Sequence, residues 1–198
     1  MNKASSLFTK REYFVAPKYQ TVAIIPEYLI YDADQKQLGK IKHTRGKWKN
    51  FLRFFVKSKL LGLTLHVLDM QERTLLTFRR RPTIFSSTIS ISDGNGRTLG
   101  YLKQKFYLLK PKIEIFDTNK NIVAQIKGDW KAWKFTITDA AGNEIGLINR
   151  KWANAIKDVL NTQDQYRVEL TYETDNENHR RLVVGSALAL GIILREDE

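Results

Sequence analysis

The C-terminal segment from Arg180 to Glu196 constrains the fold more than any other part of the chain. Its central run, Leu182–Leu194, holds thirteen residues with no charge and one hydroxyl. As an α-helix this run is about 20 Å long, whereas a bilayer core of roughly 30 Å needs about 20 apolar residues. Because a helix that is apolar on every side must be enclosed on every side, the rest of the chain is expected to surround it.

The residues before this run contain a repeated hairpin pattern. Each copy is an alternating apolar strand that ends at an aspartate, followed by a polar turn and a returning apolar strand. The copies end at Asp32, Asp69, Asp93, Asp117 and Asp139, and the last four are spaced by 24, 24 and 22 residues. An opening strand around 19–25 and a late strand, Tyr166–Tyr172, bring the total to about twelve.

These two features together predict a mainly β protein. Barrels of ~11 strands are wide enough to enclose a central helix. We therefore expect a closed antiparallel β-barrel of about twelve strands around a buried C-terminal helix at 178–195. Residues 1–198 are expected to form one domain, with 1–18 as an N-terminal arm. An alternative is that the apolar run anchors the chain in a membrane.

The recurring aspartates allow a turn role or a metal role. Asp93-Gly94-Asn95-Gly96 resembles the start of a calcium loop, but the twelfth position, which should be a carboxylate, is Gln104. Recurrence at every hairpin favours side chains that cap their own turns. We expect no bound metal and no cofactor.

The charge of the chain points to an acidic partner. The formal net charge is +12, and the window from Lys40 to Arg81 has twelve Lys or Arg against two acids, which is +10. Such a concentration predicts binding to anionic lipid or to nucleic acid, unless it is only a solvated face. The chain has no cysteine, which excludes disulfides, thiol catalysis and thiolate metal sites.

Two segments within this window are candidate binding elements. In Lys42–Lys59, aromatic residues fall on one helical face among seven cations, a pattern typical of an interfacial membrane helix, although the same residues could form a barrel strand or lid. The second segment is Arg79–Arg81, in which at most two side chains can share a face of a strand. The predicted headgroup-binding residues are Arg45, Lys47, Lys49, Arg53, Lys57, Lys59, Arg79 and Arg81, with Trp48 and Phe51 as membrane-contact aromatics.

Several motifs resemble a known group of proteins. They are Lys103–Phe106, Leu109–Ile115, Gly128–Trp133, Phe135–Asp139 and Ile148–Trp152. Over roughly 55–196 the chain resembles the phospholipid scramblase, LURP-one-related and Tubby C-terminal-like superfamily. The resemblance implies a twelve-stranded barrel around a C-terminal helix.

The resemblance also implies two activities. Tubby-like domains bind phosphoinositide headgroups through surface Lys and Arg without catalysis, whereas eukaryotic scramblases are associated with lipid movement, calcium and palmitoylated cysteines. The scramblase calcium segment corresponds to Thr162–Tyr166, where only Asp164 remains of an acidic pair, and there is no cysteine to acylate. The resemblance therefore favours lipid binding over scrambling.

No catalytic constellation is visible. The sequence lacks a nucleophile elbow, a P-loop and an HExxH motif, and His43, His66 and His179 are far apart, with His66 expected to face outward from its strand. We expect a non-enzymatic, cytoplasmic protein, without a transmembrane segment, that docks peripherally on the anionic inner face of a membrane. The alternatives are a nucleic-acid-binding barrel and a regulatory barrel that binds a protein partner.

Overall fold

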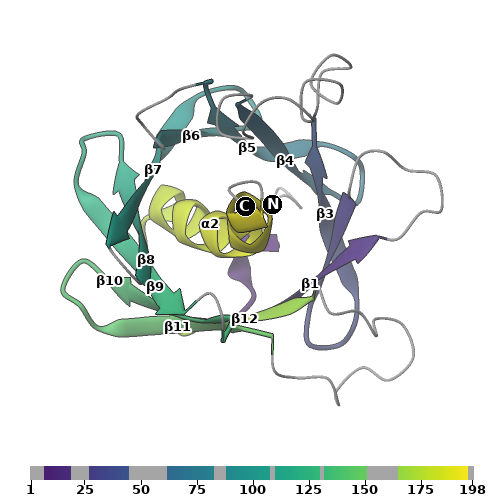
Figure 1. The fold of residues 1–198 in the computed structure, drawn as a ribbon. Coiled ribbons are helices and arrows are strands. Elements are labelled where there is room, and N and C mark those ends of the chain that lie inside the picture. Colours follow the sequence, from purple (N-terminus) through teal and green to yellow (C-terminus); the bar gives the residue numbers. More distant parts are fainter. Residues whose placement is uncertain are drawn as a thin grey trace, which may run out of the picture.

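Twelve antiparallel strands close into a barrel, and a long helix runs through its centre (Figure 1). The computed structural model describes residues 7–18, 27–44, 62–82, 88–107, 110–129, 132–150 and 165–195. Each strand pairs with its neighbours in the sequence, and β1 closes the ring by pairing with β12. The elements are β1 (Glu12–Lys18), β2 (Glu27–Tyr31), β3 (Gln37–His43), β4 (Leu63–Asp69), β5 (Thr74–Arg80), β6 (Thr88–Asp93), β7 (Thr98–Tyr107), β8 (Lys110–Asp117), β9 (Ile122–Asp129), β10 (Lys134–Asp139), β11 (Glu144–Asn149), β12 (Tyr166–Leu170) and α2 (Glu177–Arg195).

This architecture confirms the predicted fold class, with one difference at the start of the barrel. The predicted opening strand at 19–25 lies outside the described residues. Instead, residues 12–18, which the sequence placed in an N-terminal arm, form β1. Four consecutive residues of β1, Tyr13–Ala16, are all buried, so this strand lacks the alternation by which the other strands were recognised.

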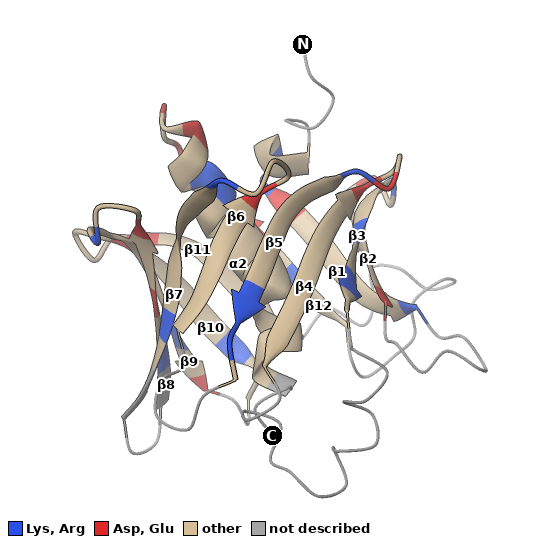
Figure 2. Ribbon diagram, turned by 90° about the horizontal axis from the view of Figure 1, so that it is seen from above, with Lys and Arg blue, Asp and Glu red and all other residues tan. Residues whose placement is uncertain are grey.

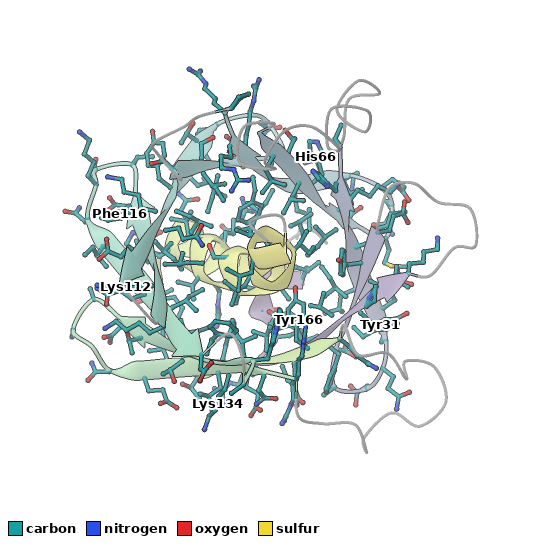
Figure 3. All side chains as sticks on the ribbon, in the orientation of Figure 1. Tyr31, His66, Lys112, Phe116, Lys134 and Tyr166 are labelled. Atoms are coloured by element: carbon teal, nitrogen blue, oxygen red, sulfur yellow. The ribbon has the colours of Figure 1, made fainter. Side chains whose placement is uncertain are left out.

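The helix is enclosed as its composition requires. Every residue from Leu182 to Leu194 is buried, and the helix contacts strands β7, β8, β9 and β12. The ring of Tyr166, labelled in Figure 3, extends from β12 towards the helix, and its hydroxyl donates a hydrogen bond to the carbonyl of Leu188. Among the described helices, none is both long enough and apolar enough to cross a bilayer. The burial of Leu182–Leu194 is the enclosed arrangement that the apolar run predicted.

Local signals fix where the helix begins. The Oδ1 atom of Asn176 accepts a hydrogen bond from the backbone N–H of His179 at 3.1 Å, as expected of an N-cap residue. Glu177 in the first turn pairs with Arg181 at 2.7 Å. Phe8 lies at this end of the barrel, where its ring is 5.9 Å from the Arg181 guanidinium. The start of the helix thus lies at the end of the barrel that residues 7–9 help to cover.

The aspartate hairpins lie at this same end and share one geometry. In the first three, Oδ1 of the aspartate accepts hydrogen bonds from the backbone N–H groups two and four residues later, as Asp69 does from Gln71 and Arg73, both at 2.9 Å. Asp117 and Asp139 likewise accept a hydrogen bond from the backbone N–H four residues later. The third residue after each aspartate has a positive φ; these residues are Gln35, Glu72, Gly96, Lys120 and Gly142. The aspartates are turn residues, as predicted.

Candidate functional site

The outer face of β4 to β7 carries a dense group of hydroxyl side chains. Because outward residues recur every second position, the register brings Thr77 opposite Ser92, and Ser90 opposite Tyr101. Thr88 and Thr98 extend the same row on β6 and β7. Hydroxyl groups can both donate and accept hydrogen bonds, so this face suits a polar ligand with several oxygen atoms.

Two arginines lie at one end of this face. Arg79 and Arg81 are exposed and project outward, whereas Arg80 points into the barrel and is only 3% exposed. The triplet therefore divides as the sequence predicted, with two of its members on one side. In Figure 2, where Lys and Arg are blue, the end of β5 is blue beside a largely neutral face formed by β4, β5 and β6.

The arginines and hydroxyls line two adjoining surface hollows. One has a volume of about 560 Å³ and is lined by Arg79, Arg81, Pro82, Thr88, Ser90, Thr98 and Tyr101. The other, of about 430 Å³, shares both arginines and Ser90 and extends towards His66, Thr77 and the turn at Asp93. Together they form a shallow site, here called the β5 groove, which is large enough for a lipid headgroup.

His66 forms one wall of the β5 groove. It faces outward, as predicted, and its Nδ1 atom lies 3.1 Å from Oγ1 of Thr77. Partial burial against the strand surface lowers the pKa of the His66 imidazole below its ordinary value of 6.5. At neutral pH the imidazole is therefore mostly uncharged, so one ring nitrogen can donate a hydrogen bond and the other can accept one.

Cations on other parts of the barrel wall are neutralised by acids. Lys42 on β3 lies 2.9 Å from Glu72 and 3.4 Å from Glu27, and Lys40 also pairs with Glu72. On β12, Arg167 pairs with Glu12 and with Glu169 at 2.7 Å. Within the described parts of the chain, Arg79 and Arg81 make no ion pair. Their charge is therefore available to an incoming anion.

Most of the predicted binding residues cannot be placed. Arg45, Lys47, Lys49, Arg53, Lys57 and Lys59, together with Trp48 and Phe51, lie outside the described residues. The calcium-segment residue Asp164 lies outside them as well. Arg79 and Arg81 are thus the two predicted site residues that the structure brings together.

Sequence reasoning did not identify the hydroxyl residues of the β5 groove. They come from three strands, and only the register brings them together. A signal was present in the polar positions of the alternation, since Ser90 and Ser92 share one face of β6 and Thr98 and Tyr101 border it on β7. In the described part of the chain, no three His, Asp or Glu side chains converge where they could hold a metal ion.

Trp133 has a packing role. It is buried, its ring lies edge-on to Phe135 with centroids 5.7 Å apart, and it is 6.0 Å from the ring of Tyr166. The guanidinium of Arg150 stacks on it at 3.8 Å. These contacts hold Trp133 in the core of the barrel, and Trp130 lies outside the described residues.

A closed twelve-stranded barrel filled by its own C-terminal helix defines a class of fold, and comparisons with known proteins identify the family. The Scramblase family model matches residues 26–193, and the chain belongs to this family. A protein of Bacillus subtilis described as uncharacterized protein YxjI is 23% identical over 168 residues, covering 74% of this chain and 96% of that protein.

A solved structure supports the same fold. An X-ray structure of an Arabidopsis thaliana protein superposes with a TM-score of 0.58 and 12% sequence identity, covering 98% of this chain and 96% of that chain. At this identity the likeness concerns the fold alone. The resemblance to the scramblase family that the motifs suggested is thereby confirmed by the family model.

Proposed function

We propose that this protein is a non-catalytic barrel that binds the phosphate of anionic lipid headgroups in the β5 groove. The observation that carries the proposal is the pair Arg79 and Arg81, which extend from one face into a hydroxyl-lined hollow and have no acid to neutralise them among the described residues. Membership of the Scramblase family supports a lipid-binding role.

The chemistry of the groove suits phosphate. An arginine fork donates two parallel hydrogen bonds to phosphate oxygens, and Ser90 and Tyr101 offer further hydroxyls in the same hollow. Each Lys or Arg near an anionic surface contributes about 1 kcal/mol at physiological salt. Two arginines therefore supply about 2 kcal/mol, enough for a reversible attachment to which the unplaced cations of 45–59 would add.

The proposed site of action is the inner face of a cell membrane. This leaflet is rich in anionic lipid and attracts cationic surfaces within about a Debye length. The net charge of +12 supports such an attraction. We place the protein there as a peripheral cytoplasmic component, in which the barrel stays folded around its helix and contributes only its outer face.

Vesicle co-sedimentation tests the proposal. The protein should bind vesicles containing phosphatidylglycerol and not neutral phosphatidylcholine vesicles, and a rise from 50 to 300 mM salt should weaken binding because surface charges are screened. Binding to both vesicle types alike, or to neither, would overturn it. Tight binding to nucleic acid with none to acidic vesicles would instead support the nucleic-acid alternative.

A charge-matched pair of variants locates the site. Arg79→Gln/Arg81→Gln should weaken binding about 30-fold, which corresponds to about 2 kcal/mol. The control, Lys127→Gln/Lys134→Gln, removes the same charge from exposed positions on β9 and β10. Lys134 is labelled in Figure 3 on the side of the barrel opposite His66. An equal loss in both pairs would show that net charge alone, and not the groove, drives binding.

A further inference from the structure

His66 and Arg79 are diagonal neighbours on the outer wall of the barrel. The register between β4 and β5 pairs His66 with Thr77 and Thr64 with Arg79. Side chains related in this way on one face are separated by ~7–8 Å at Cα, a gap that an imidazole and a guanidinium can close onto a shared phosphate. Both residues line the same hollow of about 430 Å³, together with Arg81.

The acids nearest His66 are already engaged. On β3, Lys42 lies directly opposite His66 and is held by Glu27 and Glu72, and Lys40 on the same strand pairs with Glu72. At the β6 end of the hollow, the carboxylate of Asp93 accepts bonds from the turn and from Arg97 at 3.1 Å. These acids therefore offer the imidazole no free counter-charge.

The two arginines that line the hollow together with His66 are not balanced by acids. Arg79 and Arg81 face the hollow from β5, and no described acid pairs with them. A proton on the imidazole would add a third positive charge to a partly desolvated surface, which is unfavourable while the hollow is empty. An anion bound in the hollow makes protonation of the imidazole favourable, because its negative charge attracts His66, Arg79 and Arg81 at once.

We propose that His66 is a proton-coupled contact for the headgroup phosphate, so that the β5 groove takes up a proton as it binds anionic lipid and binds more tightly as the pH falls. The inference rests on the proposed function and adds a specific partner for the phosphate. The imidazole Nε2–H and Nδ1–H would both donate, one to a phosphate oxygen and the other to Thr77, which is already in contact.

The lowered pKa of His66 sets the direction of the effect. The free protein holds the imidazole neutral at pH 7, and bound phosphate raises its pKa towards or above its ordinary value of 6.5. Binding then gains strength as the pH falls from about 7.5 to about 5.5, the range in which a histidine of this kind changes charge. A site built only from arginine would show no such dependence.

Phosphatidylglycerol vesicles provide the probe, because a phosphodiester keeps one negative charge across this pH range. The dissociation constant of the wild-type protein should fall about tenfold between about pH 7.5 and about pH 5.5, because bound phosphate favours the charged imidazole in this range. His66→Gln should lose that dependence, so that its dissociation constant is nearly the same at both pH values. The matched control is His179→Gln. His179 lies near the start of α2, where its Nε2 atom is 3.8 Å from Oδ2 of Asp117, and this variant should behave as wild type.

A direct readout of the imidazole avoids reliance on the variant alone. The NMR titration of His66 in wild-type protein should show its pKa rising when vesicles are added, and glycerophosphoglycerol, the same headgroup without acyl chains, shows whether a free phosphodiester suffices. If His66→Gln keeps the wild-type pH dependence, or the resonance does not move, the inference is overturned and the proposed function stands. If wild-type protein binds acidic vesicles at neither pH, both fail together.

Discussion

Gly191 of the helix lies directly against the ring of Tyr166 on β12. A Cβ atom added at Gly191 would lie 2.5 Å from Cε1 of Tyr166, closer than real Cβ contacts. The ring cannot easily retreat, because it is buried and its hydroxyl is bonded to the carbonyl of Leu188. The helix and the barrel wall are therefore fitted to one another at this point.

This contact predicts that Gly191→Ala destabilises the protein. Alanine improves helix propensity by about 1 kcal/mol, but overpacking against a fixed ring costs about 2 kcal/mol, so the free energy of unfolding should fall by about 1 kcal/mol. Gly185→Ala is the comparison variant, since the added atom meets a terminal methyl of Leu76, the end of a flexible side chain and not a rigid ring. Urea denaturation measures both. If both alanines stabilised the protein equally, the helix would not be packed inside the barrel.

The carboxylate of Asp69 predicts a pH-dependent stability. Burial alone would raise the pKa of Asp69, but hydrogen bonds from the backbone and side chain of Arg73 and from Gln71 outweigh it and hold the pKa below 3.8. A group with a lowered folded pKa contributes stability above its unfolded pKa, and that contribution is lost as the pH falls through the folded value.

Asp69→Asn mimics the protonated acid and should lower the free energy of unfolding by about 1 kcal/mol at pH 7. The difference from wild type should shrink below about pH 4, where the wild-type carboxyl also takes up a proton. Asp34→Asn makes the same charge change at an exposed position and should have little effect. If the free energy of unfolding of Asp69→Asn is below that of wild type by the same amount at pH 2.5 as at pH 7, the charge of Asp69 plays no part in stability.

The hairpin after β6 predicts an order among substitutions at Gly96. This residue has φ of 81°, and an added Cβ would meet nothing within 4 Å, so only backbone strain opposes a side chain. Gly96→Asn should be nearly neutral, Gly96→Ala should cost about 1 kcal/mol, and Gly96→Val should cost most, because β-branching disfavours a left-handed conformation. Thermal unfolding measures the series. An order that follows side-chain volume, with Gly96→Ala the least costly, would argue against this turn geometry.

The strands and turns were predictable because their signals are local. Period-two alternation and an aspartate at each strand end determine the hairpins one at a time, and an apolar run without a polar side determines the enclosed helix. The position of the special turn glycine was not predictable. The positive φ belongs to Gly96, whereas Gly94 lies where an added Cβ would be 2.2 Å from the carbonyl oxygen of Thr74.

The candidate site was only partly predictable. Arg79 and Arg81 were identified because a run of arginines on a strand must place alternate members on one face. The hydroxyl lining depends on the register of β5, β6 and β7, which a single strand does not reveal. The residue with positive φ in each turn could not be predicted from its residue type. Gln35, Glu72 and Lys120 occupy in their hairpins the position that Gly96 occupies in its own.

The central claim is that the face of β4 to β7 contacts lipid, and a site-specific label tests it most directly. Because the chain has no cysteine, Thr64→Cys beside Arg79 and Thr136→Cys on the outer face of β10 each introduce one labelling site. With an environment-sensitive fluorophore, acidic vesicles of brominated phosphatidylglycerol should quench the label at 64 and leave the label at 136 nearly unchanged. Equal quenching at both positions, or quenching at 136 alone, would contradict the claim.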